Sequence, residues 1–286
     1  MAAAACAWAV SSAPSARAAA RQAQVEPRSI AERLAEARRL TEAGQIDAAL
    51  AIYREIQQQQ DAPFEAGYAI AWLEARRGQW KEARAALQAV WPRVPEAELG
   101  AAHDLLGRIH HQLGDFEQAA QAWQIAAARR PQDHELRFRL GTLYAGLGPA
   151  RLDQAISALQ AAVELAPERA RYRLELGFAY ENQARFEAAR REYRRAAALI
   201  PEMPHAWARL GALEARAGVG ELEAAEQHLR RALELDPDFL LALFQLGNLL
   251  RRQGQTEAAR PYLERFDRLR RAARDQELSH DPQPNP

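Results

Sequence analysis

Residues 170–203 have the sequence ARYRLELGFAYENQARFEAARREYRRAAALIPEM, and this stretch decides the fold. Its small residues Gly177 and Ala189 recur along the whole chain at steps of 34 or 36 residues. The first series is Ala37, Ala71, Gly107, Gly141, Gly177, Gly211 and Gly247. The second series is Ala49, Ala83, Ala119, Ala155, Ala189, Ala225 and Ala259. Self-similarity at this period is typical of a solenoid, in which stacked repeats present a long surface and no single catalytic pocket.

Each repeat is predicted to be two antiparallel helices joined by a tight turn. In residues 100–112 and 117–130, apolar side chains recur three or four positions apart, which is the period of an α-helix. Gly114, between them, suits the left-handed conformation that ends a helix, and Asp115 is placed to cap the next helix. A proline near the end of most repeats should stop the second helix, because proline cannot continue a helix interior. These prolines are Pro95, Pro131, Pro167, Pro201 and Pro237.

The small residues of both series have a common physical explanation. Helices that pack about 8–10 Å apart need positions where no bulky side chain intervenes. We therefore expect Gly177 and Ala189, with their counterparts, to mark the places where the two helices of a repeat cross.

The fifth repeat resembles the tetratricopeptide repeat, a helix–turn–helix unit of about 34 residues. The residues that carry this resemblance are Leu176-Gly177, Tyr180, Phe186, Ala189, Tyr193, Ala196 and Pro201. The resemblance covers about residues 30–272 and implies an all-α, right-handed superhelical α-solenoid of about seven repeats, of the bacterial type. The expected solenoid spans residues 28–272, with repeats at about 30–63, 64–99, 100–133, 134–169, 170–203, 204–239 and 240–272.

Several local features depart from the repeat pattern. The first repeat has Glu36-Ala37 where Leu-Gly is expected, which suits a terminal repeat that meets water on one side. Repeats four and six have two extra residues in the turn, around Pro149-Ala150 and Val219-Gly220. Ser29 and Glu32 form a capping-box pattern that should start the first helix. In the last helix, Pro261 should cause a kink or a delayed start, and residues 273–286 are expected to be a disordered tail.

Residues 1–27 differ from the repeats and leave two interpretations open. A short apolar run from Ala2 to Val10 is followed by small residues that end near Ala18 or Ala20, as in a signal peptide with its cleavage site. The positively charged leader of such a peptide is missing. The segment is therefore either a signal peptide of a periplasmic or exported protein or an uncleaved disordered tail of a cytoplasmic one. No run of 18 or more apolar residues exists, so no transmembrane segment is expected.

The composition argues against several classes of function. The 38 basic and 38 acidic residues balance, so no general attraction to nucleic acid or to an anionic membrane is expected. Cys6 is the only cysteine, and this excludes intramolecular disulfides and thiolate metal sites. His103 and His110 share a helix face, but no cysteine or carboxylate completes a ligand set, so we interpret them as structural. Without a phosphate-binding loop or a nucleophile elbow, we expect neither an enzyme nor a cofactor.

The family resemblance implies where a partner would bind. In tetratricopeptide arrays the first helix of each pair lines a concave groove, which here should hold a protein or peptide. The residues expected to contact the partner are Tyr68, Trp72, Arg108, Phe138, Arg139, Arg171, Phe178, Asn182, Arg209, Arg216, Phe244 and Asn248. Arginines interleaved with aromatic rings suit a segment with acidic and apolar residues. The alternative interpretation is a solvated face on which these arginines pair with nearby glutamates.

One known use of the groove is not reproduced in this sequence. Repeat proteins that hold chaperone C-termini have a carboxylate clamp of Lys, Asn and Arg, but here the corresponding positions include Asp104, Leu105 and Phe138. The sequence thus predicts a non-enzymatic adaptor for protein interactions, which we place in a bacterial envelope assembly. A structural scaffold that self-associates through its ends, and a regulatory subunit of an enzyme complex, are the alternatives.

Overall fold

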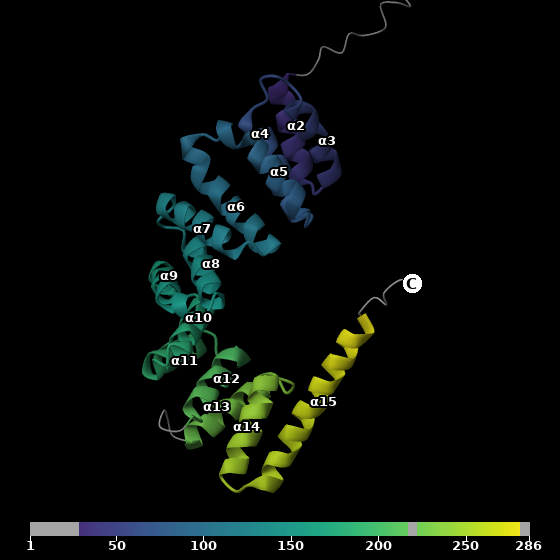
Figure 1. Cartoon of the computed structure of the whole chain (residues 1–286). Helices are drawn as coiled ribbons and strands as arrows, with labels where there is room; N and C mark the ends of the chain where they lie inside the picture. Colours follow the sequence, from purple (N-terminus) through teal and green to yellow (C-terminus); the bar gives the residue numbers. More distant parts are fainter. Residues whose placement is uncertain (1–28, 217–221, 281–286) are drawn as a thin grey trace, which may run out of the picture. The chain divides into compact units, whose positions relative to one another are not determined.

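The computed structural model describes residues 29–216 and 222–280, with side chains described as far as residue 276. This part of the chain forms fourteen α-helices, α2 to α15, and contains no strand (Figure 1). Consecutive helices pack as antiparallel pairs, which confirms the predicted all-α solenoid of helix–turn–helix repeats. The expected signal peptide in residues 1–27 and the extra turn residues Val219-Gly220 lie outside the described residues.

The chain divides into two compact units, at residues 1–91 and 92–286. The helices of the first unit are α2 (Ile30–Glu42), α3 (Ile46–Gln57), α4 (Phe64–Arg76) and α5 (Trp80–Val90). Helix α2 packs on α3, and α4 packs on both α3 and α5. The unit therefore consists of two helix pairs, with α4 joining them.

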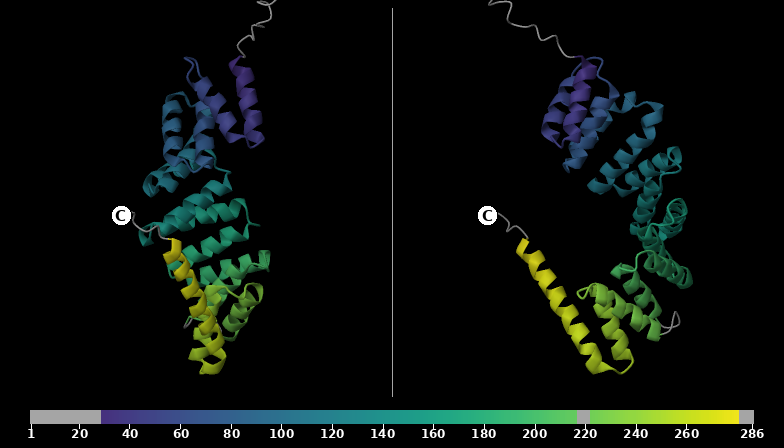
Figure 2. Two further views of the ribbon diagram at one scale, coloured as in Figure 1. Left: turned by 90° about the vertical axis from the view of Figure 1, so that its right-hand side faces the viewer. Right: turned by 180° about the vertical axis from the view of Figure 1, so that it is seen from behind.

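The second unit contains five helix pairs. Their first helices are α6 (Leu99–Leu113), α8 (His134–Gly146), α10 (Ala170–Asn182), α12 (Pro204–Glu214) and α14 (Leu240–Arg252). Their second helices are α7 (Phe116–Arg129), α9 (Leu152–Leu165), α11 (Phe186–Leu199), α13 (Leu222–Leu235) and α15 (Thr256–His280). Within this unit, α9 and α11 lie on the outer side of α8 and α10 (Figures 1 and 2). First and second helices thus form different faces.

The small residues lie where the helices of a repeat cross, as predicted. A Cβ atom on Gly177 would come within 2.5 Å of the Tyr193 ring, and one on Gly211 within 2.9 Å of the Ala225 carbonyl oxygen. Ala189 and Ala225 are fully buried. A larger side chain at these positions would force the two helices apart, which explains the 34- or 36-residue recurrence.

Four of the five repeat-ending prolines act as predicted, and Pro95 differs, because α5 already ends at Val90. Helices α7, α9, α11 and α13 each end two residues before the proline of their repeat. Between helices of a pair, Gly114 has the left-handed φ of 83°, and Ala184 has a φ of 58° in the corresponding turn between α10 and α11. A side chain in this conformation costs about 1–2 kcal/mol, so Ala184 is a strained position.

Of the two helix caps predicted from the sequence, the one at the start of α2 is confirmed and the one at the start of α7 is not. Ser29 and Glu32 form the expected capping box at the start of α2. Asp115 occupies the N-cap position of α7, but its side chain makes no capping hydrogen bond there. Its Oδ2 lies 3.1 Å from His110 Nδ1 instead, so the carboxylate joins the two helices of the repeat.

The last helix is longer than expected. Helix α15 continues from Thr256 to His280, so the expected tail of residues 273–286 begins too early. Residues 264–276 contain five arginines and two alanines, which are good helix formers, and neither glycine nor proline, and this explains the continuation. Pro261 lies inside the helix near its N-terminal end and does not delay its start.

Candidate functional site

The predicted partner-binding residues are divided between the two units. Tyr68 and Trp72 lie on α4 of the first unit, and the other ten lie on or just after the first helices of the second unit. We call the exposed side of α6, α8, α10, α12 and α14 the first-helix face. Tyr68 and Trp72 belong to the first unit and are therefore not part of the first-helix face.

One part of the first-helix face is a charged network between α6 and α8. Arg139 Nη1 donates to Asp104 Oδ1 at 3.0 Å, and Arg139 Nε lies 3.4 Å from Glu135 Oε1. Arg130 Nη1 lies 3.8 Å from the other oxygen of Asp104. Arg139 is therefore paired within the protein, as the alternative interpretation of a face with local ion pairs predicts.

Phe138 differs from the other predicted residues because its ring belongs to the core. Only 4% of the residue is exposed, and its ring stacks on Tyr172 with the ring centroids 4.4 Å apart. The Arg171 guanidinium lies 5.0 Å above the Phe138 ring centroid. Phe138 is thus too buried to contact a partner directly, since packing between α8 and α10 requires its ring. It supports Arg171 instead.

The Tyr172 hydroxyl closes this network. It donates to Glu135 Oε2 at 2.7 Å and lies 2.9 Å from His134 Nδ1. Burial, followed by the hydrogen bond to the Glu135 carboxylate, raises the pKa of Tyr172 to about 12. The hydroxyl therefore stays protonated and keeps Glu135 next to Arg139.

A second part of the first-helix face is centred on Glu181 of α10. Its carboxylate accepts a hydrogen bond from the Tyr193 hydroxyl at 2.8 Å. Arg216 lies 3.5 Å and Arg209 4.0 Å from the same carboxylate. Burial and the nearby Glu181 carboxylate raise the pKa of Tyr193. Two arginines thus share one glutamate and leave a surplus of positive charge.

Aromatic rings lie directly under these two arginines. Arg209 is 4.5 Å from the ring centroid of Phe178, and Arg216 is 4.6 Å from that of Phe186. Such cation–π contacts hold a guanidinium in place and leave its edge able to donate hydrogen bonds. The predicted residues Phe178, Arg209 and Arg216 are therefore brought together, with Phe186 and Glu181 added.

Two further arginines have no carboxylate partner among the described residues. Arg171 lies over the Phe138 ring and, like Arg108 of α6, has neither a hydrogen bond nor an ion pair among those residues. Arg171 is exposed and Arg108 half-buried. These two cations are free to bind an anionic group from outside.

The remaining predicted residues lie apart from the clusters. Asn182 is exposed at the end of α10. On α14, Asn248 donates to the Phe244 carbonyl oxygen at 2.9 Å and accepts from Arg251 at 2.8 Å. The Phe244 ring is 42% exposed and its centroid lies 5.1 Å from that of Phe266 on α15. Phe244 is therefore a separate apolar anchor.

In the first unit, the two predicted residues contact their own helix. Arg76 lies 4.8 Å above the ring centroid of Trp72, and the Tyr68 ring centroid is 5.3 Å from that of Phe64. Both Tyr68 and Trp72 are half-buried. They form a small aromatic surface on α4 that repeats the arginine-over-ring contact of the second unit.

The acidic members of the first-helix face were not among the predicted site residues. Glu135 could have been found from its position four residues before Arg139, the spacing of a helical ion pair. Glu181 lies 28 and 35 residues from its arginine partners Arg209 and Arg216, and no local pattern signals such a contact. Stacking of repeats, and not sequence proximity, creates this part of the site.

The described residues offer neither a cluster of metal ligands nor a membrane-spanning helix. No group of three His, Cys, Asp or Glu side chains there is arranged to hold a metal ion. His103 Nδ1 lies 2.7 Å from the Leu99 carbonyl oxygen, and the His111 ring packs between those of Phe116 and Trp123. In the described part of the chain, no helix combines the length and the apolar character that crossing a membrane requires.

Comparison with proteins of known structure shows the same architecture elsewhere. The C-terminal part of a TPR repeat-containing protein from Cytophaga hutchinsonii covers 87% of this chain with 96% of its own length, a TM-score of 0.65 and 15% identity. MamA covers 66% of this chain with 99% of its own, a TM-score of 0.54 and 22% identity. YrrB, described as a TPR protein with an unusual peptide-binding site, covers 67% of this chain with 96% of its own, a TM-score of 0.59 and 19% identity. At these identities the likeness shows the fold alone.

A curated sequence relative matches only a part of the chain. Human protein O-mannosyl-transferase TMTC1 is 27% identical over 38% of this chain. The match spans 16% of the length of that relative, so it does not extend to most of the larger protein.

Family models match most of the repeats directly. Three models, each described as tetratricopeptide repeat, match residues 65–96, residues 105–148, 150–204 and 176–238, and residues 228–260. These segments contain the glycine and alanine positions at which the helices of the second to seventh repeats cross. The chain therefore belongs to the tetratricopeptide repeat family.

Proposed function

We propose that this chain is an adaptor that binds an acidic segment of a partner protein on the first-helix face of its second unit. Tetratricopeptide repeats are in general non-enzymatic modules for protein interaction. The observation that supports this surface is the pair of arginines, Arg108 and Arg171, that no carboxylate of the described residues neutralises. An arginine binds a carboxylate with two parallel hydrogen bonds, which suits a partner rich in Asp or Glu.

The paired arginines have a different part in this proposal. Arg139, Arg209 and Arg216 are held by Asp104, Glu135 and Glu181. They supply a fixed polar surface, in which three carboxylates balance the three arginines, while the free guanidinium groups form the new bonds. Phe178 and Phe244 offer ring surface for apolar residues of the same segment.

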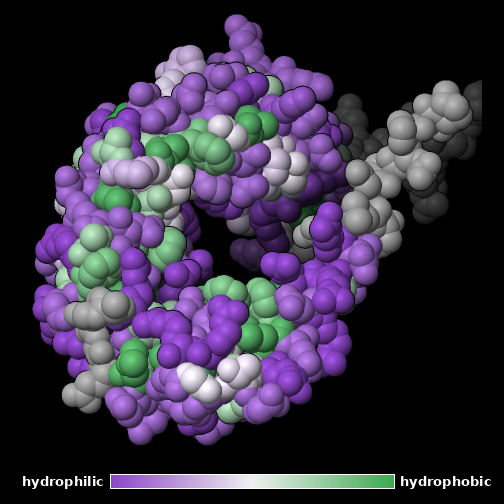
Figure 3. All heavy atoms as spheres, turned by 60° about the horizontal axis from the view of Figure 1, so that its bottom comes forward, coloured by the Kyte–Doolittle hydropathy of each residue, from purple (hydrophilic) through white to green (hydrophobic). Residues whose placement is uncertain are grey.

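The surface composition agrees with a polar, reversible contact. On the face shown in Figure 3, hydrophilic residues predominate and hydrophobic ones form separate patches. YrrB, a protein with the same fold, is described as having a peptide-binding site, which is consistent with a peptide or a peptide-like segment as the ligand here.

Crosslinking in cells tests the proposal. A photo-crosslinking amino acid at Phe178 should give an adduct that mass spectrometry identifies, whereas one at Ile125, exposed on α7, should not give the same adduct. The double variant Arg108→Glu/Arg171→Glu should remove the adduct at Phe178. A matched double reversal on second helices, Arg231→Glu/Arg260→Glu, should leave it intact, because both of these arginines only pair with a glutamate three residues away.

Two results would contradict the proposal. Retention of the adduct in the Arg108→Glu/Arg171→Glu variant would show that the free arginines do not hold the partner. An adduct with the mass of two copies of this chain would favour the self-associating scaffold.

We further propose a place in a bacterial envelope assembly, and this part rests only on residues 1–27. The apolar run and the small residues after it have the pattern of a secretory signal. Sequencing of the amino terminus from native cells tests the idea: cleavage near Ala18 or Ala20 is expected, and a protein that still begins at Met1 would contradict it.

A further inference from the structure

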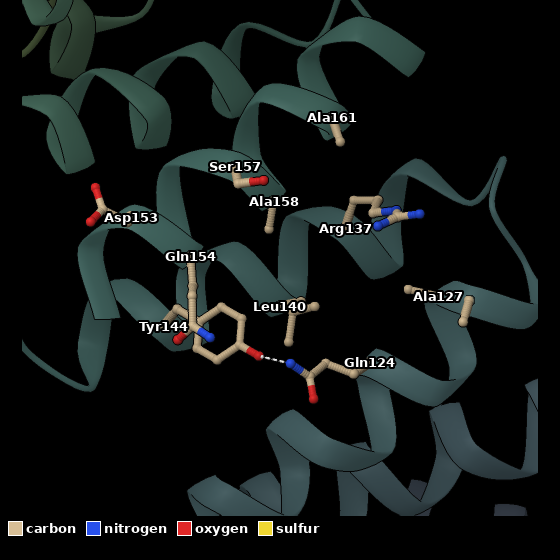
Figure 4. A pocket seen from close by; sticks show the side chains of 11 residues that line it. Gln124, Ala127, Arg137, Leu140, Tyr144, Asp153, Gln154, Ser157, Ala158 and Ala161 are labelled. Atoms are coloured by element: carbon tan, nitrogen blue, oxygen red, sulfur yellow. Dashed lines mark hydrogen bonds between the residues drawn. The ribbon is translucent and has the colours of Figure 1, made fainter. Parts of the chain in front are cut away.

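A second site lies on the opposite side of the repeats, between the second helices α7 and α9. A pocket of about 540 Å³ opens there, and α8 forms its floor. We call it the outer pocket; α8 contributes Arg137, Leu140 and Tyr144 (Figure 4). These three residues are spaced three and four positions apart, so they share one face of the helix.

Arg137 is the unusual member of the outer pocket. Its Nε is buried and has no hydrogen-bond partner, and the described residues place no carboxylate within ion-pair distance of its guanidinium. A buried N–H group without a partner is costly, and native proteins contain few of them. The Arg137 guanidinium in the pocket therefore lacks both an ion-pair partner and a hydrogen bond at Nε among the described residues.

In the next repeat, the arginine at the same position has hydrogen-bond and ion-pair partners within the chain. Arg173 lies 36 residues after Arg137, at the corresponding place on α10. Its Nε donates to the Pro167 carbonyl oxygen at 3.1 Å, and its Nη1 donates to Glu192 Oε2 at 3.0 Å. The residue that corresponds to Glu192 in the outer pocket is Ala158. Arg137 thus lacks the carboxylate that Arg173 has.

In the repeat after that, the side chain at this position also has partners within the chain, although the residue types differ. Trp207 occupies the position of Arg173, and its Nε1 donates to the Pro201 carbonyl oxygen at 2.9 Å. Its ring stacks on that of His228, which occupies the position of Glu192. Of these three repeats, only the one with Arg137 has no partner on its second helix for the side chain at this position.

The walls of the outer pocket are made of small residues. Ala127 and Ala128 line it from α7, and Ala158 and Ala161 from α9. At the corresponding positions of the next repeat pair, the sequence has Val163, Glu164, Glu192 and Arg195. Four alanines in place of bulky or charged side chains leave room for a side chain from outside and let its backbone approach closely.

The nearby acidic residue does not fill the site. Asp153 also lines the pocket, but its Oδ1 accepts a hydrogen bond from Gln183 Nε2 at 2.6 Å. Figure 4 shows Asp153 and Arg137 at opposite ends of the pocket. Along α9, Asp153 precedes Ala161 by eight residues, or about 12 Å of helix. The Arg137 end of the pocket is therefore open to an anion.

We propose that the outer pocket is a second protein-binding site, in which a glutamate side chain of a partner protein pairs with Arg137. The carboxylate takes the place that Glu192 has beside Arg173, and the alanine walls receive the stem of the side chain and the backbone that bears it. The site is separate from the first-helix face, so one solenoid binds acidic segments on two sides.

Peptide titration of the full chain tests this site. The probes are two capped, alanine-based peptides that differ only in a central Glu or Gln. The readout is the side-chain Nε–Hε resonance of each arginine in protein labelled with 15N-arginine. The Glu peptide should shift the Arg137 resonance with saturation and bind about tenfold more tightly than the Gln peptide, because a charge-assisted bond is lost with Gln. Arg173, already paired, should not respond and is the internal reference.

Two variants separate recognition from folding. Ala158→Glu should supply the missing carboxylate from within and abolish the response of Arg137 to the Glu peptide. Arg137→Gln should weaken binding about tenfold as well, while leaving the pocket open. Unchanged near-ultraviolet circular dichroism of both variants verifies their folding.

Three outcomes would overturn the proposal. They are equal binding of the two peptides, no response of Arg137 at millimolar Glu peptide, and continued peptide binding by Ala158→Glu. If the Arg137 resonance shifts when the protein alone is concentrated, the ligand of the outer pocket is a second copy of this chain and not a different protein. Because Arg108→Glu/Arg171→Glu leaves the outer pocket unaltered, that variant should titrate normally whether or not the first-helix face binds a partner.

Discussion

The groove between α7 and α9 and the groove between α9 and α11 are built from the same repeat positions, yet only one of them is closed. Both have an arginine from the helix beneath and a glutamine–tyrosine hydrogen bond across the repeats, Gln124 with Tyr144 and Gln160 with Tyr180. They differ in the residue opposite the arginine, which is Glu192 in the closed groove and Ala158 in the open one. With Ala158 in place of a glutamate, and with the alanine walls beside it, Arg137 has no internal ion pair and is available to an external ligand.

The largest effect is expected from breaking the closed groove. In the pair Arg173–Glu192, the side chains are 14% and 10% exposed, so Glu192→Gln leaves a mostly buried guanidinium without its counter-ion. We expect a loss of about 3 kcal/mol in the free energy of unfolding, measured by urea denaturation. Arg137→Gln is the matched control and should cost close to nothing in the free protein, since Arg137 has no partner to lose. Equal losses in both variants would remove the distinction between the grooves.

Closing the open groove should give a smaller effect of opposite sense. Ala158→Glu places a carboxylate beside Arg137, and a double-mutant cycle with Arg137→Gln should measure a favourable coupling of about 1–2 kcal/mol. The absence of coupling would mean that the two positions do not face each other as Arg173 and Glu192 do.

A third groove, between α11 and α13, adds a pH-dependent contrast. There the pair across the repeats is charged: Arg194 Nη2 donates to Glu214 Oε1 at 2.8 Å, and His228 Nδ1 lies 2.7 Å from Glu214 Oε2. Burial opposes ionisation of Glu214, but the hydrogen bonds and charges of His228 and Arg194 outweigh it and lower the pKa of the carboxyl group.

The sign of the pH effect follows from this lowered pKa. Because the folded state favours the carboxylate, its contribution is present above the ordinary pKa of 4.5 and is lost as the pH falls below it. Amide hydrogen exchange should therefore show α12 and α13 opening more readily at pH 3 than at pH 5. Glu214→Gln should reduce this dependence, whereas a slope that is unchanged in the variant would assign it to other groups.

The smallest difference between the two grooves is expected in the stability lost when Gln124 or Gln160 is replaced by alanine. Gln124→Ala and Gln160→Ala each remove one hydrogen bond to a tyrosine hydroxyl, and each should lower stability by about 1 kcal/mol. The two losses, measured by thermal unfolding, should agree closely, because the frame around them is the same. A large discrepancy would show that the surroundings of the Tyr144 and Tyr180 hydroxyl groups are not equivalent.

Much of the fold was predictable from short-range patterns. The 34- or 36-residue recurrence located the helix crossings within repeats, because such a crossing tolerates only a small residue, as Gly177 against Tyr193 illustrates. The prolines located the ends of second helices for the same kind of steric reason. The end of α15 was less predictable, since a charged, helix-forming segment and a disordered tail have similar composition.

The candidate sites were predictable only in part. Arg209, Arg216 and Phe178 were predicted on the same face by repeat position and lie close together in the structure, but Glu181 was not foreseen as their partner. Phe138 was expected on the surface and is buried, because the pattern of repeats gives the face of a helix and not the depth of each ring. Arg137 could have been noticed by comparing positions 137 and 158 with 173 and 192, but the sequence could not show that its Nε is unpaired.

The sequence by itself determined the repeat architecture, since the spacing of glycine, alanine and proline is a local steric requirement that each repeat meets separately. Only the tertiary structure decided which charges remain available to a partner. Whether an arginine is free depends on residues about 20 to 35 positions away that stacking brings within 4 Å, as for Arg173 with Glu192 and Arg139 with Asp104. The pairing of charges is a property of the stack, and for that reason only the packed helices showed that Arg108 and Arg171, already predicted from their repeat positions, and Arg137, which was not predicted, lack a carboxylate partner among the described residues.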